Sequence, residues 1–200
     1  MDGGAHSVGN QLQIADLYGP TMYGYSMGGR LALYIAVKHA FYLPALILES
    51  TSAGLEDGRE KRVVADEAWA MRFETEPLRD VLQDWYSQPV FAPLGDGDAY
   101  VSMVESRFLN DGRALARSLR GMSTGRQEPL WDMLHTVDIP VLLLAGEHDP
   151  RYIELMQRMA GLLPRAEMHI VPRAGHNVHV DNPDGVCDVV LPFLKKIALD

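Results

Sequence analysis

Apolar and polar positions alternate in blocks along this chain, and the blocks switch repeatedly between a strand pattern and a helix pattern. Near the start, the pattern predicts an amphipathic helix that ends over Gln11–Tyr18, a strand at Thr21–Tyr25, a helix at Arg30–His39 and a strand at Leu43–Leu48. Near the end, it predicts a strand at Ile139–Ala145, a helix at Tyr152–Leu163, a strand at Ala166–Val171 and a helix at Val186–Ile197 with Pro192 inside it. Strands that alternate with helices predict a mostly parallel sheet with covering helices.

The middle of the chain has a different character. From Gly54 to Leu134 it is rich in charge, Trp and Met with helical periodicity, and it is poor in β-branched runs. We therefore expect residues 54–134 to form a helical lid inserted into an α/β core made of residues 1–53 and 135–200.

Composition narrows the classes of partner. The 200 residues suffice for one sizeable core, and no apolar run approaches the roughly 20 residues of a membrane span. A formal net charge of -9 without a Lys/Arg cluster argues against nucleic acid and favours a small molecule. The single cysteine, Cys187, excludes an internal disulfide framework and lies in an apolar helical pattern that predicts a buried thiol. No secretory signal precedes the first block, so we expect a cytoplasmic protein of undetermined oligomeric state.

A motif of nucleophilic catalysis lies between the first predicted strand and helix. Gly24-Tyr25-Ser26-Met27-Gly28 matches G-x-S-x-G, the elbow that exposes a serine at the C-terminal edge of an α/β-hydrolase sheet. The glycines would be needed because side chains flanking Ser26 collide with backbone in so tight a turn. The alternative is a glycine-rich turn in which Ser26 only caps the helix.

An acid and a base follow in the order that this fold requires. Asp149 comes directly after one predicted strand and His176 after the next, so both fall on loops at the edge where Ser26 is expected. His176 would take a proton from Ser26, while Asp149 would fix its tautomer. Asp149 could instead be only a helix cap, and Glu147 and Glu49 are weaker candidates for the acid. His148 and His179 are expected beside the site or on the surface, and no histidine pair has the spacing of a metal site, so we expect no metal.

Four segments together resemble one enzyme family. They are Gly24 to Arg30, Glu49 to Leu55, Asp84 to Phe91 and Ala174 to His179. They are similar to 2-succinyl-6-hydroxy-2,4-cyclohexadiene-1-carboxylate synthases of menaquinone biosynthesis, members of the α/β-hydrolase superfamily. Arg30 directly after Gly-Gly and the segment from Asp84 to Phe91 are the specific parts of the resemblance.

The resemblance implies a lyase that eliminates pyruvate from a polycarboxylate, without metal or cofactor. Ser26, activated by His176, would relay a proton, and the backbone N–H of Met27 would hold the enolate oxygen. By the resemblance, the substrate-binding residues would be Tyr25, Met27, Arg30, Arg62, Trp85 and Arg107. Guanidinium groups suit carboxylates because they bind two oxygens at once.

Several alternatives stay open. Arg62 and Arg107 lie in charge-rich helical surroundings that are typical of solvated surface arginines, and Trp85 could simply be lid core. The family has strands, and an oxyanion loop, before the point where this sequence begins, so we expect a core without its N-terminal strands. An esterase or carbon–carbon bond hydrolase with the same triad, or a truncated non-catalytic chain, are the alternative functions.

Overall fold

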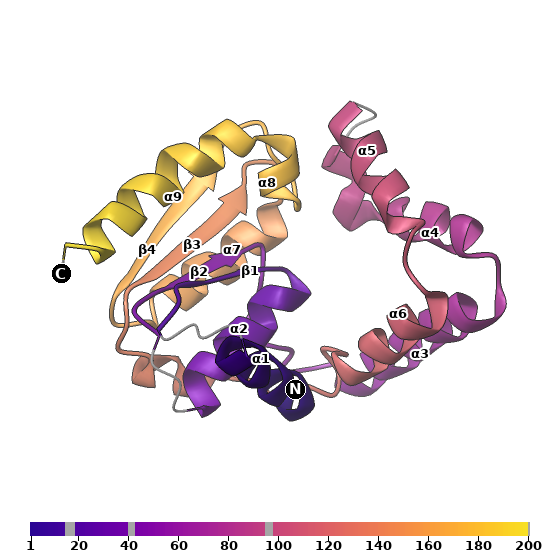
Figure 1. Cartoon of the computed structure of the whole chain (residues 1–200), viewed down its shortest axis with the longest axis horizontal. Coiled ribbons are helices and arrows are strands. Elements are labelled where there is room, and N and C mark those ends of the chain that lie inside the picture. Colours follow the sequence, from indigo (N-terminus) through magenta and orange to yellow (C-terminus); the bar gives the residue numbers. More distant parts are fainter. Residues whose placement is uncertain (15–18, 40–42, 95–97, 200) are drawn as a thin grey trace. The chain divides into compact units, whose positions relative to one another are not determined.

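The computed structural model describes residues 1–14, 19–39, 43–94 and 98–199 (Figure 1). Its contacts divide the chain into two compact units: Met1–Ala53 with Leu130–Asp200, and Gly54–Pro129. Residues 130–134 belong to the first unit, whereas the sequence placed them in the insertion. The reason is that Leu130, Trp131 and Leu134 are buried in the hydrophobic core of the first unit.

In the residues that the structure describes, the first unit is built on a four-stranded parallel sheet, which confirms the predicted fold class. Its strands are β1 (Met22–Tyr25), β2 (Leu46–Glu49), β3 (Val141–Gly146) and β4 (Ala166–Val171), in the order β1-β2-β3-β4. Met22 pairs with Leu46, Leu46 with Val141 and Val141 with Ala166, so the four strands start at one level. Every residue of β2 and β3 is buried, as expected for strands covered on both faces.

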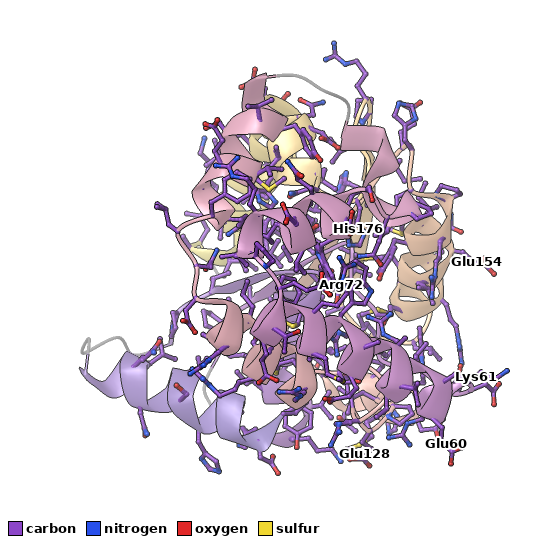
Figure 2. All side chains as sticks on the ribbon, turned by 90° about the vertical axis from the view of Figure 1, so that its right-hand side faces the viewer. Glu60, Lys61, Arg72, Glu128, Glu154 and His176 are labelled. Carbon is purple, nitrogen blue, oxygen red and sulfur yellow. The ribbon has the colours of Figure 1, made fainter. Side chains whose placement is uncertain are left out.

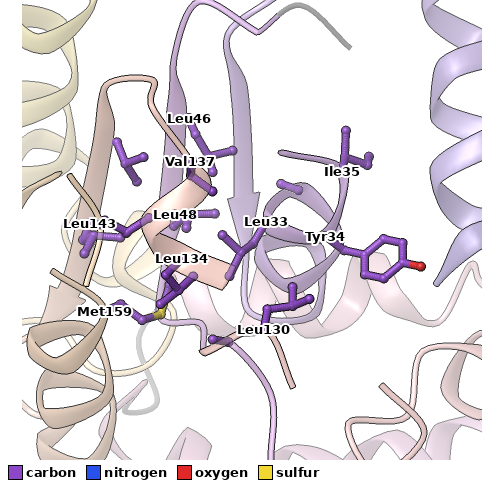
Figure 3. Close-up of a cluster of buried hydrophobic side chains, with 14 of the residues drawn as sticks. Leu33, Tyr34, Ile35, Leu46, Leu48, Leu130, Leu134, Val137, Leu143 and Met159 are labelled. Atoms are coloured by element: carbon purple, nitrogen blue, oxygen red, sulfur yellow. The ribbon is translucent and has the colours of Figure 1, made fainter. Parts of the chain in front are cut away.

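Helices cover both faces of this sheet. They are α1 (Asp2–Ile14), α2 (Met27–Lys38), α7 (Pro150–Ala160), α8 (Val178–Asp181) and α9 (Pro183–Ile197), together with the 3-10 helix η2 (Trp131–Thr136). One face packs against α2, α7 and η2 through side chains such as Leu33, Leu48, Leu134, Leu143 and Met159 (Figure 3). The other face packs against α9, which runs along β3 and β4 in Figure 1.

The second unit is helical in the described residues. Its elements are α3 (Arg59–Thr75), α4 (Leu78–Tyr86), η1 (Pro89–Leu94), α5 (Asp98–Arg107) and α6 (Gly112–Gly121). A small core of Ala70, Phe73, Val81, Leu82 and Ala116 joins α3, α4 and α6. The charged residues Glu60 and Lys61 project from the first turn of α3 (Figure 2).

Two sequence predictions need correction, and a third is tested only in part. Cys187 is exposed rather than buried, because α9 turns Val186 and Phe193 toward the sheet and Cys187 therefore points to solvent. The helix after Ser26 begins at Met27 instead of Arg30, since the elbow leads directly into it. The first helix occupies Asp2–Ile14, and residues 15–18 of its predicted end lie outside the described residues.

Candidate active site

Ser26 lies at the sharp turn between β1 and α2, in an unusual backbone conformation. Its φ is 49° and its ψ is -111°, a conformation that costs a non-glycine residue free energy and persists only where surrounding contacts stabilise it. Such contacts are made at both the N–H and the carbonyl of Ser26. The Ser26 N–H donates to the carbonyl of Glu49 at 2.8 Å, and the Ser26 carbonyl accepts from the Thr51 hydroxyl at 2.7 Å and from the Arg30 N–H at 3.1 Å.

Close backbone contact explains the glycines of this turn, but not all of them. A Cβ on Gly24 would lie 2.6 Å from the Cα of Gly29, and one on Gly29 would lie 2.7 Å from the Cβ of Thr51. A Cβ on Gly28 would have no neighbour within 4 Å. The expectation that side chains on both sides of Ser26 collide with backbone is therefore wrong for Gly28. The two positions of this turn that must be glycine for steric reasons are Gly24 and Gly29.

Ser26, His176 and Asp149 form one hydrogen-bonded chain. The distance from Ser26 Oγ to His176 Nε2 is 3.0 Å, and that from His176 Nδ1 to Asp149 Oδ2 is 2.8 Å. Both the imidazole and the carboxylate are buried. With its Nδ1 proton directed at Asp149, the imidazole can accept the Ser26 proton at Nε2, which is the arrangement of a serine nucleophile or relay base.

Asp149 combines the two roles that the sequence presented as alternatives. As the N-cap of α7 it accepts from the Tyr152 N–H through Oδ1, while Oδ2 faces His176. Capping fixes the carboxylate at the end of β3, so the same contact that starts the helix also orients the acid.

Backbone contacts lock the acid loop against the histidine loop. A Cβ on Gly146 would lie 2.1 Å from the Gly175 carbonyl, so only glycine permits this approach. The His148 N–H donates to the Ala174 carbonyl, and the Arg173 N–H donates to Glu147. The Glu147 carboxylate, a weaker candidate for the acid, therefore binds the backbone of the histidine loop instead of orienting the His176 imidazole.

A partly buried carboxylate supports the histidine loop from its other side. Asp181 accepts from the Gly175 N–H at 2.7 Å. Burial raises the pKa of Asp181, an effect that this hydrogen bond opposes and the nearby Glu49 charge reinforces. The loop that carries His176 is thus held by a carboxylate whose charged form is disfavoured.

Two tyrosine rings contact the His176 imidazole. The Tyr25 ring lies 5.4 Å from the His176 ring and the Tyr152 ring 4.4 Å from it, centre to centre. Tyr25 is one of the binding residues that the resemblance implies. The sequence analysis missed Tyr152, although its place three residues after Asp149, in the first turn of α7, was a usable signal.

The N-terminus of α2 offers donors for an oxyanion. Arg30 is the first residue whose N–H bonds back within the turn, so the amides of Met27, Gly28 and Gly29 have no partner within the helix. The positive end of the helix dipole also favours negative charge here. The Met27 amide is the one that the resemblance assigns as an oxyanion donor. The side chain of Met27 is partly exposed.

The other predicted binding residues divide between the units. Arg30 is buried in α2, one turn beyond Ser26. In the second unit, Arg62 Nε donates to the buried Asp66 at 2.8 Å, and Arg107 is exposed near the end of α5. Because Arg62 and Arg107 lie in the other unit from Ser26, their convergence on it stays a prediction.

Trp85 belongs to an aromatic cluster in the second unit. Its ring lies 5.1 Å from that of Trp69 and 5.8 Å from that of Phe73, centre to centre. These contacts agree with the alternative that Trp85 is lid core, and a role in substrate binding stays a prediction.

No group of three or more His, Cys, Asp or Glu side chains in the described part of the chain could hold a metal ion. Among the same residues, no helix combines the length and apolar character needed to cross a membrane.

The fold and the Ser26–His176–Asp149 geometry define a class of protein. Residues 4–189 match the model of the alpha/beta hydrolase family, and the chain belongs to that family. It is 39% identical over 180 residues to 2-succinyl-6-hydroxy-2,4-cyclohexadiene-1-carboxylate synthases of Yersinia pseudotuberculosis serotype O:3 (strain YPIII) and Yersinia pestis (strain Pestoides F). The match covers 86% of this chain and 62% of each relative, so the chain spans less than two thirds of their length.

Solved structures give the same picture. The structure of MenH from S. aureus superposes with a TM-score of 0.91 at 30% identity, over 97% of this chain and 74% of that one. A thermophilic esterase from Thermogutta terrifontis superposes with a TM-score of 0.79 at 22% identity, over 92% of this chain and 68% of that one, and shows the fold alone. The resemblance found in the sequence is confirmed.

Proposed function

We propose that the chain eliminates pyruvate from 2-succinyl-5-enolpyruvyl-6-hydroxy-3-cyclohexene-1-carboxylate. The observation that carries the proposal is the hydrogen-bonded chain Ser26–His176–Asp149, on a polypeptide similar over most of its length to proteins named as synthases of the product. The buried Arg30 one turn beyond Ser26 adds a cation beside a site that would take a polycarboxylate.

In this reaction Ser26 acts as a base rather than as an acyl acceptor. His176 Nε2 takes the Ser26 proton, and Ser26 Oγ removes the ring proton next to the succinyl ketone. The resulting enolate oxygen is held by the Met27 N–H at the start of α2. As the carbonyl re-forms, the electron pair moves through the ring double bond and breaks the bond between ring carbon and enolpyruvyl oxygen. The released enolpyruvate takes a proton and becomes pyruvate.

Asp149 makes His176 able to hold the proton between these steps. A buried carboxylate 2.8 Å from Nδ1 stabilises the imidazolium that forms when Nε2 is protonated. The substrate carries three carboxylates, and we assign their recognition to Arg30, Arg62 and Arg107, with Tyr25 and Trp85 against the ring.

The test is pyruvate release by the purified chain. A coupled lactate dehydrogenase assay should show pyruvate forming together with the ultraviolet absorbance of the cyclohexadiene product, and Ser26→Ala should abolish both. The chain spans 62% of the length of its curated relatives, and the proposal concerns the activity of this chain itself. The assay therefore uses this chain rather than a longer one. A folded chain that releases no pyruvate and hydrolyses no ester supports the non-catalytic alternative.

The second candidate is an esterase or carbon–carbon bond hydrolase, favoured by the elbow geometry of Ser26, which also suits a nucleophile. Mass spectrometry distinguishes the two. The elimination proceeds without a covalent adduct on Ser26, whereas an obligatory acyl-Ser26 would establish the hydrolase reaction.

A further inference from the structure

A second carboxylate–imidazole pair lies beside the triad, and the proposed reaction does not use it. Glu49, the last residue of β2, is completely buried. Its carboxylate accepts from the Tyr23 hydroxyl, from the His179 N–H at 3.2 Å and from His179 Nδ1 at 2.9 and 3.0 Å. A buried carboxylate that has several donors fixes those donors in return.

Glu49 also touches the elbow through its backbone. Its carbonyl accepts the Ser26 N–H, so one residue of β2 holds the strained serine with its main chain and His179 with its side chain. Burial, together with the Glu49 charge, raises the pKa of Tyr23, which keeps the phenol a donor to Glu49.

From His179 the contacts return to the catalytic histidine. The His179 ring meets the Tyr25 ring edge to face, at 5.2 Å between centres and an angle of 75°. The Tyr25 ring in turn lies 5.4 Å from that of His176. Glu49, His179, Tyr25 and His176 therefore form a continuous series of contacts within the first unit.

We propose that Glu49 and His179 are positioning residues, which hold Tyr25 against His176 and so keep the His176 imidazole aligned with Ser26. The inference rests on the proposed role of His176 as the base. Asp149 fixes one edge of the imidazole, and the rings of Tyr152 and Tyr25 both pack against it. Without His179, Tyr25 loses the edge-to-face contact that connects it to the buried Glu49, and we expect the His176 imidazole to be held less tightly.

Two substitutions of His179 separate its ring from its hydrogen bond. His179→Gln keeps a side-chain N–H for Glu49 but removes the ring that supports Tyr25. His179→Phe keeps a ring but gives up the bond to Glu49. His169→Ala, an exposed histidine of β4, is the matched control.

The readout is the proton NMR spectrum of the His176 imidazole, because its chemical shift depends on the ring current of Tyr25. We expect His179→Gln to move the His176 signals clearly, His179→Phe to move them less and His169→Ala to leave them in place. In a Tyr25→Ala background, His179→Gln should cause no further change. Unchanged His176 signals in His179→Gln, or an equal change with and without Tyr25, would overturn the proposal.

Kinetics supply a second readout. We expect His179→Gln to lower kcat on the order of tenfold with little change in KM, because misalignment of a base slows the chemical step without removing a substrate contact. A rise in KM at constant kcat would overturn the positioning role and assign His179 to substrate binding. The NMR test does not depend on turnover, so a chain that releases no pyruvate refutes the synthase assignment while the His176 signals still decide the role of His179.

Discussion

Asp181 in the first unit and two glutamates in the second unit have pKa values shifted in opposite directions. In the first unit, Asp181 is partly buried at the histidine loop, and burial raises its pKa. In the second unit, Glu67 and Glu74 lie at the surface, where hydrogen bonds from Arg120 lower the pKa of both. Asp181 thus holds the loop of His176 at a place where its charged form is disfavoured, whereas Glu67 and Glu74 carry charge where pairing with Arg120 favours folding.

This difference indicates how the two units divide their tasks. The site groups of the first unit are fixed by backbone donors and caps, as in Ser26, Asp149 and Glu49. In the second unit, arginine–carboxylate pairs such as Arg120 of α6 with Glu67 of α3 connect helix surfaces. We therefore expect substitutions of Ser26 or His176 in the first unit to change chemistry, and substitutions of the paired arginines in the second unit to change recognition or stability.

The largest expected effect is at the triad. Ser26→Ala and His176→Ala should each lower turnover on the order of 10⁴-fold or more, and the double variant should lose little beyond either one, because the residues act as a unit. Pyruvate release under single-turnover conditions measures this. Losses that add in the double variant would contradict a shared proton relay.

The glycines of the elbow give the next largest effect. Gly24→Ala should destabilise the first unit by roughly 1–3 kcal/mol or more, because its Cβ would lie 2.6 Å from Gly29 backbone. Gly28→Ala, whose Cβ has open space, should be neutral or should stabilise α2 by about 0.5–1 kcal/mol. Urea unfolding followed by circular dichroism compares the two. Equal losses would mean that Gly28 is sterically constrained after all.

The arginines test whether the second unit takes part in recognition. Arg30→Lys, Arg62→Lys and Arg107→Lys should each lower kcat/KM for the polycarboxylate about 30-fold or more, because a half-paired buried carboxylate costs about 2–5 kcal/mol. Hydrolysis of a small neutral ester should change much less. Arg117→Lys, at an exposed position of α6, is the control. If only Arg30→Lys has an effect, the second unit contributes no cation to the site.

A pH-dependent effect is expected at Asp181. Its pKa is raised in the folded protein, so the folded state loses stability as pH rises from the ordinary value of 3.8 through the folded pKa. Asp181→Asn keeps an acceptor for Gly175 without the charge. It should be at least as stable as the parent at pH 7, and this advantage should vanish below about pH 4. Asp188→Asn, an exposed position of α9, should show no such trend in unfolding curves.

The smallest effect, of opposite sign, is expected at Arg120. Because it lowers the pKa of Glu67 and Glu74, its stabilising contribution is present above their ordinary value of 4.5 and is lost as pH falls through the lowered values. Arg120→Ala should be slightly less stable at pH 7 and equal to the parent in acid. High salt should also reduce the difference, because the pairs are exposed. Lys61→Ala, at an exposed position of α3, is the control, and a difference that persists in acid would indicate lost packing instead.

The sequence by itself determined the order of the elements and of the catalytic groups. Alternating apolar runs predicted the parallel sheet, and parallel strands end at one edge, so a serine, an acid and a histidine that each follow a strand must gather there. These inferences need only local periodicity and topology, which is why Ser26, Asp149 and His176 could be chosen before any contact was known.

Only the tertiary structure decided which groups meet across long separations. Glu49 and His179 are 130 positions apart, and nothing in either segment showed that the glutamate would bind this histidine rather than His176. The exposure of Cys187 depended on the rotation of α9 about its axis, and the steric requirement at Gly29 depended on where Thr51 lies. Each outcome follows from packing between elements. The rotation of one helix or a single loop contact decides which residues meet, and the local sequence pattern does not specify it.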